Sequence, residues 1–133
     1  MDWTKEQLDA IWEKALFIDH ENEKNGFRKD MCGAWIQRDV QGEVGNYGWQ
    51  VDHIYPVSKA EDKGISADLY NNLINLQPLH HQNNGAEGKA DDYPYFNSKI
   101  VANGNKNEEK VERNTIPSTK QEELKKLFGL NDL

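Results

Sequence analysis

Hydrophobic residues near the N-terminus recur with the period of a helix. Five of them share one predicted helix face: Leu8, Ile11, Trp12, Ala15 and Leu16. Thr4 precedes this stripe and Gln7 lies three positions after Thr4, which is the sequence pattern of a capping box. The pattern predicts an N-terminal helix over residues 4–20.

Two short apolar runs follow, and each is typical of a strand. They are CGAWIQ at residues 32–37 and YGWQVDHIYPV at residues 47–57, separated by a glycine-rich connection. We expect the two runs to pair with each other as a hairpin with a long loop. The polar stretch at residues 21–30, with a turn at Gly26, is expected to be a loop.

The middle of the chain has a weaker period. Residues 58–72, SKAEDKGISADLYNN, carry few apolar residues at regular spacing, so we expect an ordered loop. Leu76 and Leu79 lie three positions apart on either side of Pro78. Because proline is tolerated in the first turn of a helix, this spacing predicts a helix that starts near Pro78.

Polar residues dominate again at residues 97–117. This segment is either a hairpin that turns at Asn103 and Gly104 or a flexible arm. After it, Ser118 and Gln121 have the spacing of a capping box. An apolar stripe and a terminal glycine then predict a final helix over residues 118–129: Leu124, Leu127, Phe128 and Gly129.

The length of 133 residues suits one domain with one modest core. The sequence contains no run of about 18 apolar residues, and its N-terminus lacks the pattern of a signal peptide. We therefore expect a cytoplasmic protein without a membrane segment. Cys32 is the single cysteine, so an internal disulfide and a zinc site built from Cys-x-x-Cys pairs are excluded.

The formal net charge of −7 argues against a protein that coats nucleic acid through bulk electrostatics. A local site that meets phosphate through a metal is compatible with this charge. The residues able to form one are Asp52, His53, His80, His81, Asn83, Asn84, Lys89, Asp91 and Asp92. A strand with a carboxylate and a histidine, followed by a loop and an Asn-rich helix, would join an oxygen-ligand metal site to a base, and Mg²⁺ prefers such ligands.

Three ordered blocks of this sequence resemble the HNH endonucleases. The blocks are YGWQVDHIYPVS, NLQPLHHQNN and GKADDYP, and the upstream FRKDMCGAWI resembles a segment that precedes the hairpin in one branch of that family. The resemblance implies an α+β fold with a ββα-metal (His-Me finger) core at about residues 28–96, flanked by the N-terminal and C-terminal helices. It makes residues 1–133 a single HNH nuclease domain.

The resemblance also implies a role for each matching residue. His53 matches the general base that takes a proton from the attacking water, and Asp52 matches a metal ligand. Asn75 matches the middle asparagine, which holds the loop and orients the base. Asn84, nine residues after Asn75, matches the second metal ligand. Lys89 would be a phosphate contact or a cation at the helix end, although the gap before it is longer than in the family pattern.

Other positions remain open on sequence grounds. Asn83 competes with Asn84 as a ligand, and only the spacing favours Asn84. His80 is expected to pack or to support the site, His81 to face solvent or DNA, and Arg28 to contact phosphate. Neither a zinc staple nor a structural zinc is expected, because His80 and Asn83 stand where a Cys-x-x-Cys pair would fall.

The adjacency of Asp52 and His53 poses a geometric question. Along a regular strand neighbouring side chains point to opposite faces, so both reach one site only if the strand twists or bulges, or if the base acts from the strand's end. Pro56, just beyond, favours an end there.

The sequence and this resemblance together predict a metal-dependent endonuclease that hydrolyses DNA phosphodiester bonds, and the resemblance implies that the product carries a 5′ phosphate. It would use one divalent metal, Mg²⁺ first, with Mn²⁺ or another transition metal as alternatives. One alternative is a catalytically inactive module of the same fold that binds nucleic acid or protein. Another is a toxin whose cutting is restrained by an inhibitor protein.

Overall fold

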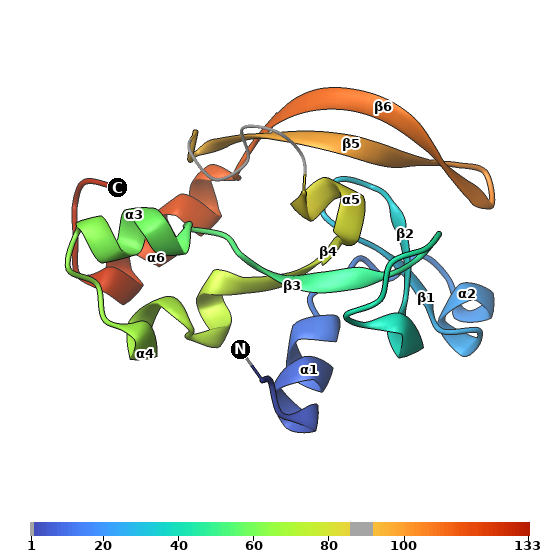
Figure 1. Ribbon diagram of the computed structural model, residues 1–133, viewed down its shortest axis with the longest axis horizontal. Helices are drawn as coiled ribbons and strands as arrows, with labels where there is room; N and C mark the ends of the chain where they lie inside the picture. The colour runs from blue at the N-terminus through green and yellow to red at the C-terminus, as the bar shows by residue number, and fades with distance from the viewer. Residues whose placement is uncertain (1, 86–91) are drawn as a thin grey trace.

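The computed structural model describes residues 2–85 and 92–133. Within them, short helices connect three two-stranded antiparallel sheets, which confirms the α+β class (Figure 1). Lys89 and Asp91 lie outside the described residues. None of the described helices combines the length and the apolar character needed to cross a bilayer.

The first helix, α1 (Lys5–Trp12), begins at the predicted capping box. The side chain of Thr4 accepts a hydrogen bond from the backbone N–H of Gln7, and the side chain of Gln7 accepts one from the N–H of Thr4. The helix ends earlier than predicted because Leu16 forms a backbone bridge with Lys29 instead of a helical turn. A second helix, α2 (His20–Lys24), occupies part of the stretch expected to be a loop.

Strand β1 (Phe27–Lys29) pairs with β2 (Trp35–Gln37), so the predicted pairing of residues 32–37 with residues 47–57 is wrong. The reason is a tight turn between β1 and β2. The carboxylate of Asp30 accepts hydrogen bonds from the backbone N–H groups of Cys32 and Ala34, at 2.9 Å each. This local turn gives β2 a partner close in sequence, and a short connection costs less chain entropy than a long one.

Strand β3 (Trp49–His53) pairs instead with β4 (Leu76–His80), and helix α5 (His81–Asn84) follows directly. The 3-10 helix η1 (Arg38–Val40) lies between β2 and β3. Pro78 is thus inside a strand, and the helix predicted to start there begins three residues later. A two-stranded sheet has open edges, where a residue without an N–H donor is tolerated.

The connection between β3 and β4, where the sequence predicted an ordered loop at residues 58–72, consists largely of short helices. It contains α3 (Val57–Asp62), α4 (Ala67–Tyr70) and the 3-10 helix η2 (Leu73–Asn75). These elements are short, so their apolar residues are too few to show a helical period in the sequence.

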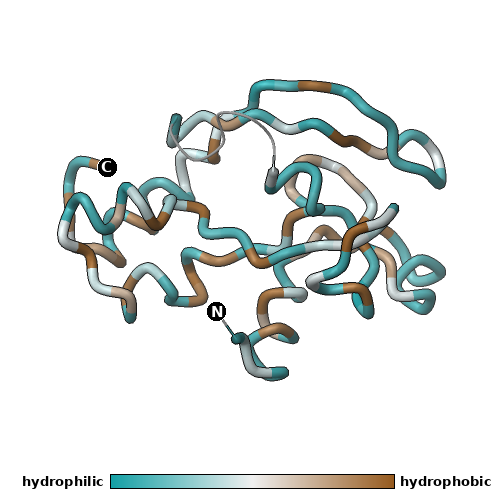
Figure 2. The backbone as a smooth tube through the Cα atoms, in the orientation of Figure 1, coloured by the Kyte–Doolittle hydropathy of each residue, from teal (hydrophilic) through white to brown (hydrophobic). Residues whose placement is uncertain are grey.

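The polar segment near the C-terminus is a hairpin, as in the first of the two predicted alternatives. Strand β5 (Tyr95–Asn103) pairs with β6 (Lys106–Thr115), and Gly104 turns the chain with φ of +63°. Figure 2 shows β6 to be hydrophilic along most of its length, which agrees with its exposed outer position.

The final helix, α6 (Ser118–Phe128), ends at Gly129 in the left-handed region, as predicted. The predicted capping box at its start is not formed. Pro117 is the N-cap, and the side chain of Gln121 donates to the carbonyl of Ile116 at 2.7 Å. Proline at the boundary already fixes the extended backbone that a cap requires.

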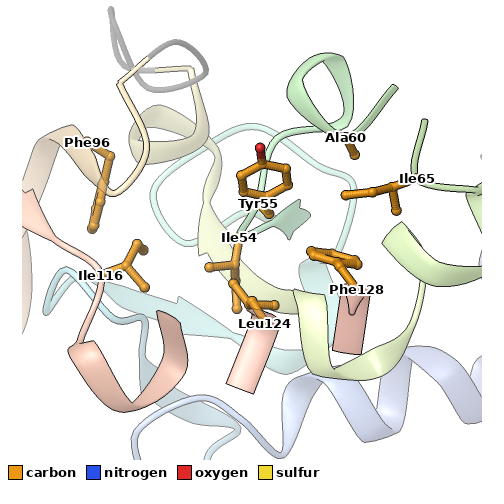
Figure 3. Close-up of a cluster of buried hydrophobic side chains, with 8 residues drawn as sticks. All are labelled: Ile54, Tyr55, Ala60, Ile65, Phe96, Ile116, Leu124 and Phe128. Carbon is orange, nitrogen blue, oxygen red and sulfur yellow. The ribbon is translucent and has the colours of Figure 1, made fainter. Parts of the chain in front are cut away.

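Two buried clusters hold β3 at its two ends. One gathers around Ile54 and Tyr55, which directly follow β3, and is closed by α3 and α6 (Figure 3). The other packs α1 against Trp49 at the start of β3, where the rings of Trp12 and Trp49 lie 5.5 Å apart. Anchoring at both ends fixes the strand that carries the candidate site.

Candidate functional site

Asp52 and His53 lie at the end of a strand that has no bulge. Every residue of β3 has a partner in β4, from Trp49 opposite His80 to His53 opposite Leu76. The alternation of side chains is therefore regular, and neighbouring residues point to opposite faces of the β3–β4 sheet.

Contacts with neighbouring helices identify the two faces. The side chain of Gln50 accepts a hydrogen bond from Asn84 of α5, whereas Trp49 packs on Trp12 of α1. Figure 1 likewise shows α5 with the β5–β6 hairpin on one side of this sheet and α1 on the other. Asp52 shares the α5 face with Gln50, and His53 shares the α1 face with Trp49.

Asp52 is buried, with 4% of its surface exposed. Its Oδ2 accepts a hydrogen bond from the side-chain amide of Gln77, its partner across the sheet, at 2.9 Å. Both residues line a small cavity of about 10 Å³, whose remaining walls are Met31, Ile54, Tyr93, Tyr95, Phe96 and Ile116. That volume is close to the space of one water molecule or one small ion.

The hydroxyl of Tyr93, in the wall of this cavity, is buried and has no hydrogen-bond partner among the described residues. Burial raises the pKa of Tyr93 to about 12, with smaller contributions from Tyr55 and Glu122. A buried hydroxyl without a partner costs free energy unless a bound water or ligand satisfies it. The region beside Asp52 therefore has an unsatisfied polar group as well as a carboxylate.

His53 is half-buried on the other face. Its Nε2 lies 2.7 Å from Oδ1 of Asn71, which follows α4. The ring of Trp3 lies at 6.1 Å from the imidazole and that of Tyr70 at 5.9 Å. The sequence did not single out Asn71, because the partnership joins two ends of the β3–β4 connection and leaves no local signal.

Asn75 is fully buried and closes that connection. Its Oδ1 accepts from the backbone N–H of Tyr55 at 2.7 Å, and its Nδ2 donates to the carbonyls of Tyr55 and Tyr70 at 3.2 and 2.8 Å. All three hydrogen bonds go to the backbone, just beyond His53 and just before Asn71. The arrangement is compatible with the role of holding the loop.

Two lysines support the turn that carries Asn75. Lys14 of the segment after α1 donates to the carbonyls of Leu73 and Leu76, and Lys120 of α6 donates to the carbonyl of Ile74. Burial and, to a smaller extent, the charge of Lys120 lower the pKa of Lys14 to about 8, with Glu123 acting in the opposite direction. The turn is thus held from both sides by ammonium groups.

Asn83 and Asn84 have different environments, although they are neighbours. Asn83 is buried: its Oδ1 accepts from the N–H groups of Lys99 and Ile100, and its Nδ2 donates to Asp30 and to the carbonyl of Ile100. Asn84 donates through Nδ2 to Gln50 at 2.6 Å, and its Oδ1 accepts no hydrogen bond from residues 2–85 or 92–133. Among the described residues, the side-chain oxygen of Asn84 is thus left without a donor, whereas that of Asn83 accepts two hydrogen bonds.

Asp30 is a buried residue that sequence reasoning missed. Besides the turn contacts, its Oδ2 accepts from the N–H of His80 at 3.0 Å and from Nδ2 of Asn83 at 3.0 Å. Burial raises the pKa of Asp30, and these four donors act in the opposite direction. An aspartate followed three positions later by Gly33 is a turn signature, and that signal could have identified the turn.

His80 and His81 both form hydrogen bonds with backbone carbonyls of the loop before β3. Nε2 of His80 lies 2.9 Å from the carbonyl of Asn46, and Nε2 of His81 lies 2.7 Å from the carbonyl of Gly45. Their rings are stacked with centroids 4.7 Å apart. His80 is buried and burial lowers its pKa, which favours the packing role expected for it.

The side chain of Arg28 bonds to glutamates near the N-terminus and not to the residues of the candidate site. Its guanidinium bonds bidentately to Glu23 at 2.7 and 3.0 Å, reaches Glu13 at 3.3 Å and lies over the ring of Trp12. Asp92 is exposed and paired with Arg113.

The donors that could hold a metal are those of the α5 face. Asp52 supplies a carboxylate and Asn84 a spare amide oxygen, both hard ligands that fit Mg²⁺. In the part of the chain that the structure describes, no three His, Cys, Asp or Glu side chains gather as a metal site. Among the described residues, the oxygen donors on this face are thus one carboxylate and one amide.

Comparisons with protein-family models, with curated proteins and with solved structures find no match to this chain.

Proposed function

We propose that this chain is a metal-dependent HNH endonuclease that hydrolyses DNA phosphodiester bonds. The observation that carries the proposal is the placement of the first two sequence blocks, YGWQVDHIYPVS and NLQPLHHQNN, on consecutive elements. Asp52 and His53 end β3, Asn75 closes the connection, and Asn84 ends the helix that follows β4. This strand–strand–helix order is the one that the resemblance implies.

Each residue then has a task that its surroundings support. His53 takes a proton from the attacking water, since a neutral imidazole is a suitable base near neutral pH. Asp52 and Asn84 would hold a divalent cation, Mg²⁺ or Mn²⁺, which would neutralise charge on the phosphate and the leaving oxygen. Because His53 is the last residue of β3, we propose that the scissile phosphate binds beyond the end of this strand.

A second candidate is an inactive module with the same fold that binds nucleic acid or protein. It is favoured by the opposite orientation of Asp52 and His53, each of which already has a side-chain partner. In that case the two polar residues serve the packing of the sheet and its connection alone.

Cleavage of a supercoiled plasmid distinguishes the two candidates. Wild type is incubated with Mg²⁺ or Mn²⁺, with EDTA as the control, beside His53→Ala and His20→Ala. His20 is an exposed histidine on α2 and serves as the matched control. We expect wild type and His20→Ala to cut the plasmid at similar rates. The rate of His53→Ala should be lower by a factor of about 100 or more.

The proposal fails if wild type leaves the plasmid intact with every metal, or if His53→Ala cuts as fast as wild type. The first result, with a folded protein, supports the inactive module.

A further inference from the structure

We infer that Asn71 is a positioning residue that holds His53 with its proton on Nε2, so that Nδ1 is the atom that accepts a proton. The inference rests on the proposed function for its catalytic part. The assignment of the proton itself concerns the protein alone.

The first step is the hydrogen bond between the two side chains. An amide oxygen only accepts, and Oδ1 of Asn71 lies 2.7 Å from Nε2 of His53, so Nε2 must donate. A neutral imidazole carries one N–H, which leaves a lone pair on Nδ1.

The second step is the fixed position of Asn71. It is the C-cap of α4, and its backbone N–H donates to the carbonyl of Ala67 at 2.9 Å. Asn75 reaches the carbonyl of Tyr70, the residue before Asn71, at 2.8 Å. The buried amide of Asn75 therefore places Asn71 through one intervening residue, and Asn71 contacts the imidazole.

The third step is the restriction of the imidazole ring. Trp3 and Tyr70 flank it, the latter edge-on with an interplanar angle of 73°. Rotation of the ring would move it against these neighbours and break the bond to Asn71. The role of orienting the base, which the family resemblance gave to Asn75, is thus divided: Asn75 holds the chain and Asn71 contacts the histidine.

The proton is located by ¹⁵N NMR of histidine-labelled protein with EDTA, at a pH where the imidazoles are neutral. The signals of His53 are identified by their loss in His53→Gln. His80 is an internal reference, because its Nε2 faces a carbonyl and its Nδ1 accepts from the N–H of Gln82 at 3.1 Å. We expect wild-type His53 to show the same pattern as His80, with the proton on Nε2.

Three variants test the cause. Asn71→Ala removes the acceptor and is expected to give a mixture of both tautomers. Asn71→Asp keeps an oxygen acceptor and should retain the proton on Nε2. Asn72→Ala is the control, because the side chain of Asn72 accepts from the N–H of Ile74 instead.

A proton on Nδ1 in wild type would show that the amide of Asn71 is rotated by half a turn, with Nδ2 facing the imidazole. This result would overturn the inference. An unchanged tautomer in Asn71→Ala would do the same.

Plasmid cleavage measures the catalytic part. We expect Asn71→Ala to lower kcat about 10- to 1000-fold with KM unchanged, and Asn71→Asp to restore part of the rate. If wild type does not cut, the proposed function fails, and the NMR result still decides the position of the proton. If wild type cuts and Asn71→Ala cuts equally fast, Asn71 has no role in positioning the base.

Discussion

Asp52 and His53 are consecutive residues of β3, and their side chains lie on opposite faces of the β3–β4 sheet. Each is held by a residue from a different part of the chain: Gln77 across the sheet and Asn71 across the connection. The two functions assigned to this pair, ligand and base, are therefore separable by mutation.

Asp52→Asn should weaken metal binding without unfolding the protein. The asparagine keeps an oxygen that accepts from Gln77, so the free energy of unfolding should change by about 1 kcal/mol or less. Affinity for Mn²⁺, measured by titration calorimetry, should fall about 10-fold or more, because the carboxylate charge is lost. Asp39→Asn, an exposed aspartate of η1, is the control and should bind as wild type does. Equal affinity in Asp52→Asn would remove Asp52 from the ligand set.

Asn83→Ala should mainly lower the stability of the protein, whereas Asn84→Ala should mainly weaken metal binding. Loss of Asn83 leaves buried backbone groups of β5 without a partner and removes one of the four donors to Asp30, so the free energy of unfolding, measured in urea, should fall by about 2–4 kcal/mol. Loss of Asn84 should cost about 0.5 kcal/mol or less and should weaken Mn²⁺ binding. A stable Asn83→Ala variant with weak metal binding would exchange the two assignments.

Asn75→Ala should destabilise the protein strongly, by about 3 kcal/mol or more. Three backbone groups of Tyr55 and Tyr70 would lose their partner in a buried place, and each costs about 1–3 kcal/mol. Urea unfolding followed by tryptophan fluorescence measures the loss. The neighbouring Asn72→Ala removes only one hydrogen bond, to Ile74, and should cost about 1 kcal/mol. Similar losses in both variants would contradict the special place of Asn75.

Arg28→Met should lower stability more than it lowers DNA affinity. Only 10% of its side chain is exposed, and a phosphate contact would require breaking the pair with Glu23. We expect a loss of about 1–3 kcal/mol in the free energy of unfolding, against about 0.5 kcal/mol for Arg38→Met, whose pair with Asp9 is exposed. A fall in DNA affinity at unchanged stability would instead support the phosphate contact that the sequence suggested.

Lys14 should make stability depend on pH above neutrality. Its pKa is about 8 in the folded protein, against 10.5 for an ordinary lysine, so the unfolded chain binds more protons between these values. The free energy of unfolding of wild type should therefore rise, relative to Lys14→Met, as pH increases from 7 to 10. Urea unfolding of both proteins at several pH values measures the difference. A constant difference would show that the pKa of Lys14 is the same in both states.

Local signals predicted the parts of the fold that depend on nearby residues. The capping box at Thr4 and Gln7 and the stripe of α6 were read correctly, because both sets of contacts form within one helix. The end of α1 and the partner of β2 were wrong, since they depend on pairing with Lys29 and on the buried carboxylate of Asp30. Contacts between distant residues leave no period in the sequence.

The sequence likewise indicated only some of the residues of the candidate site. The nine-residue spacing favoured Asn84 over Asn83, and this choice stays a prediction; in the structure Asn84 bonds to Gln50, whereas Asn83 bonds to the backbone of β5. The sequence also posed the question of alternation at Asp52 and His53, and β3 is regular up to its end. The sequence did not indicate Asn71, Gln77 or the hydroxyl of Tyr93, because each meets the site through contacts between residues far apart in the chain.

The hydrogen bonds of Asn75 join the two ends of the β3–β4 connection, so the residues between these ends can be exchanged or extended as a unit. Its ends are joined by hydrogen bonds, and its interior reaches open space at Gly64, where φ is +73° and no atom would meet an added side chain. Because each doubling of loop length costs only about 0.6 kcal/mol, extra residues inserted there should leave the sheet and its histidine in place. Variants of this chain could therefore acquire a new segment between α3 and α4 with no change to the strands themselves.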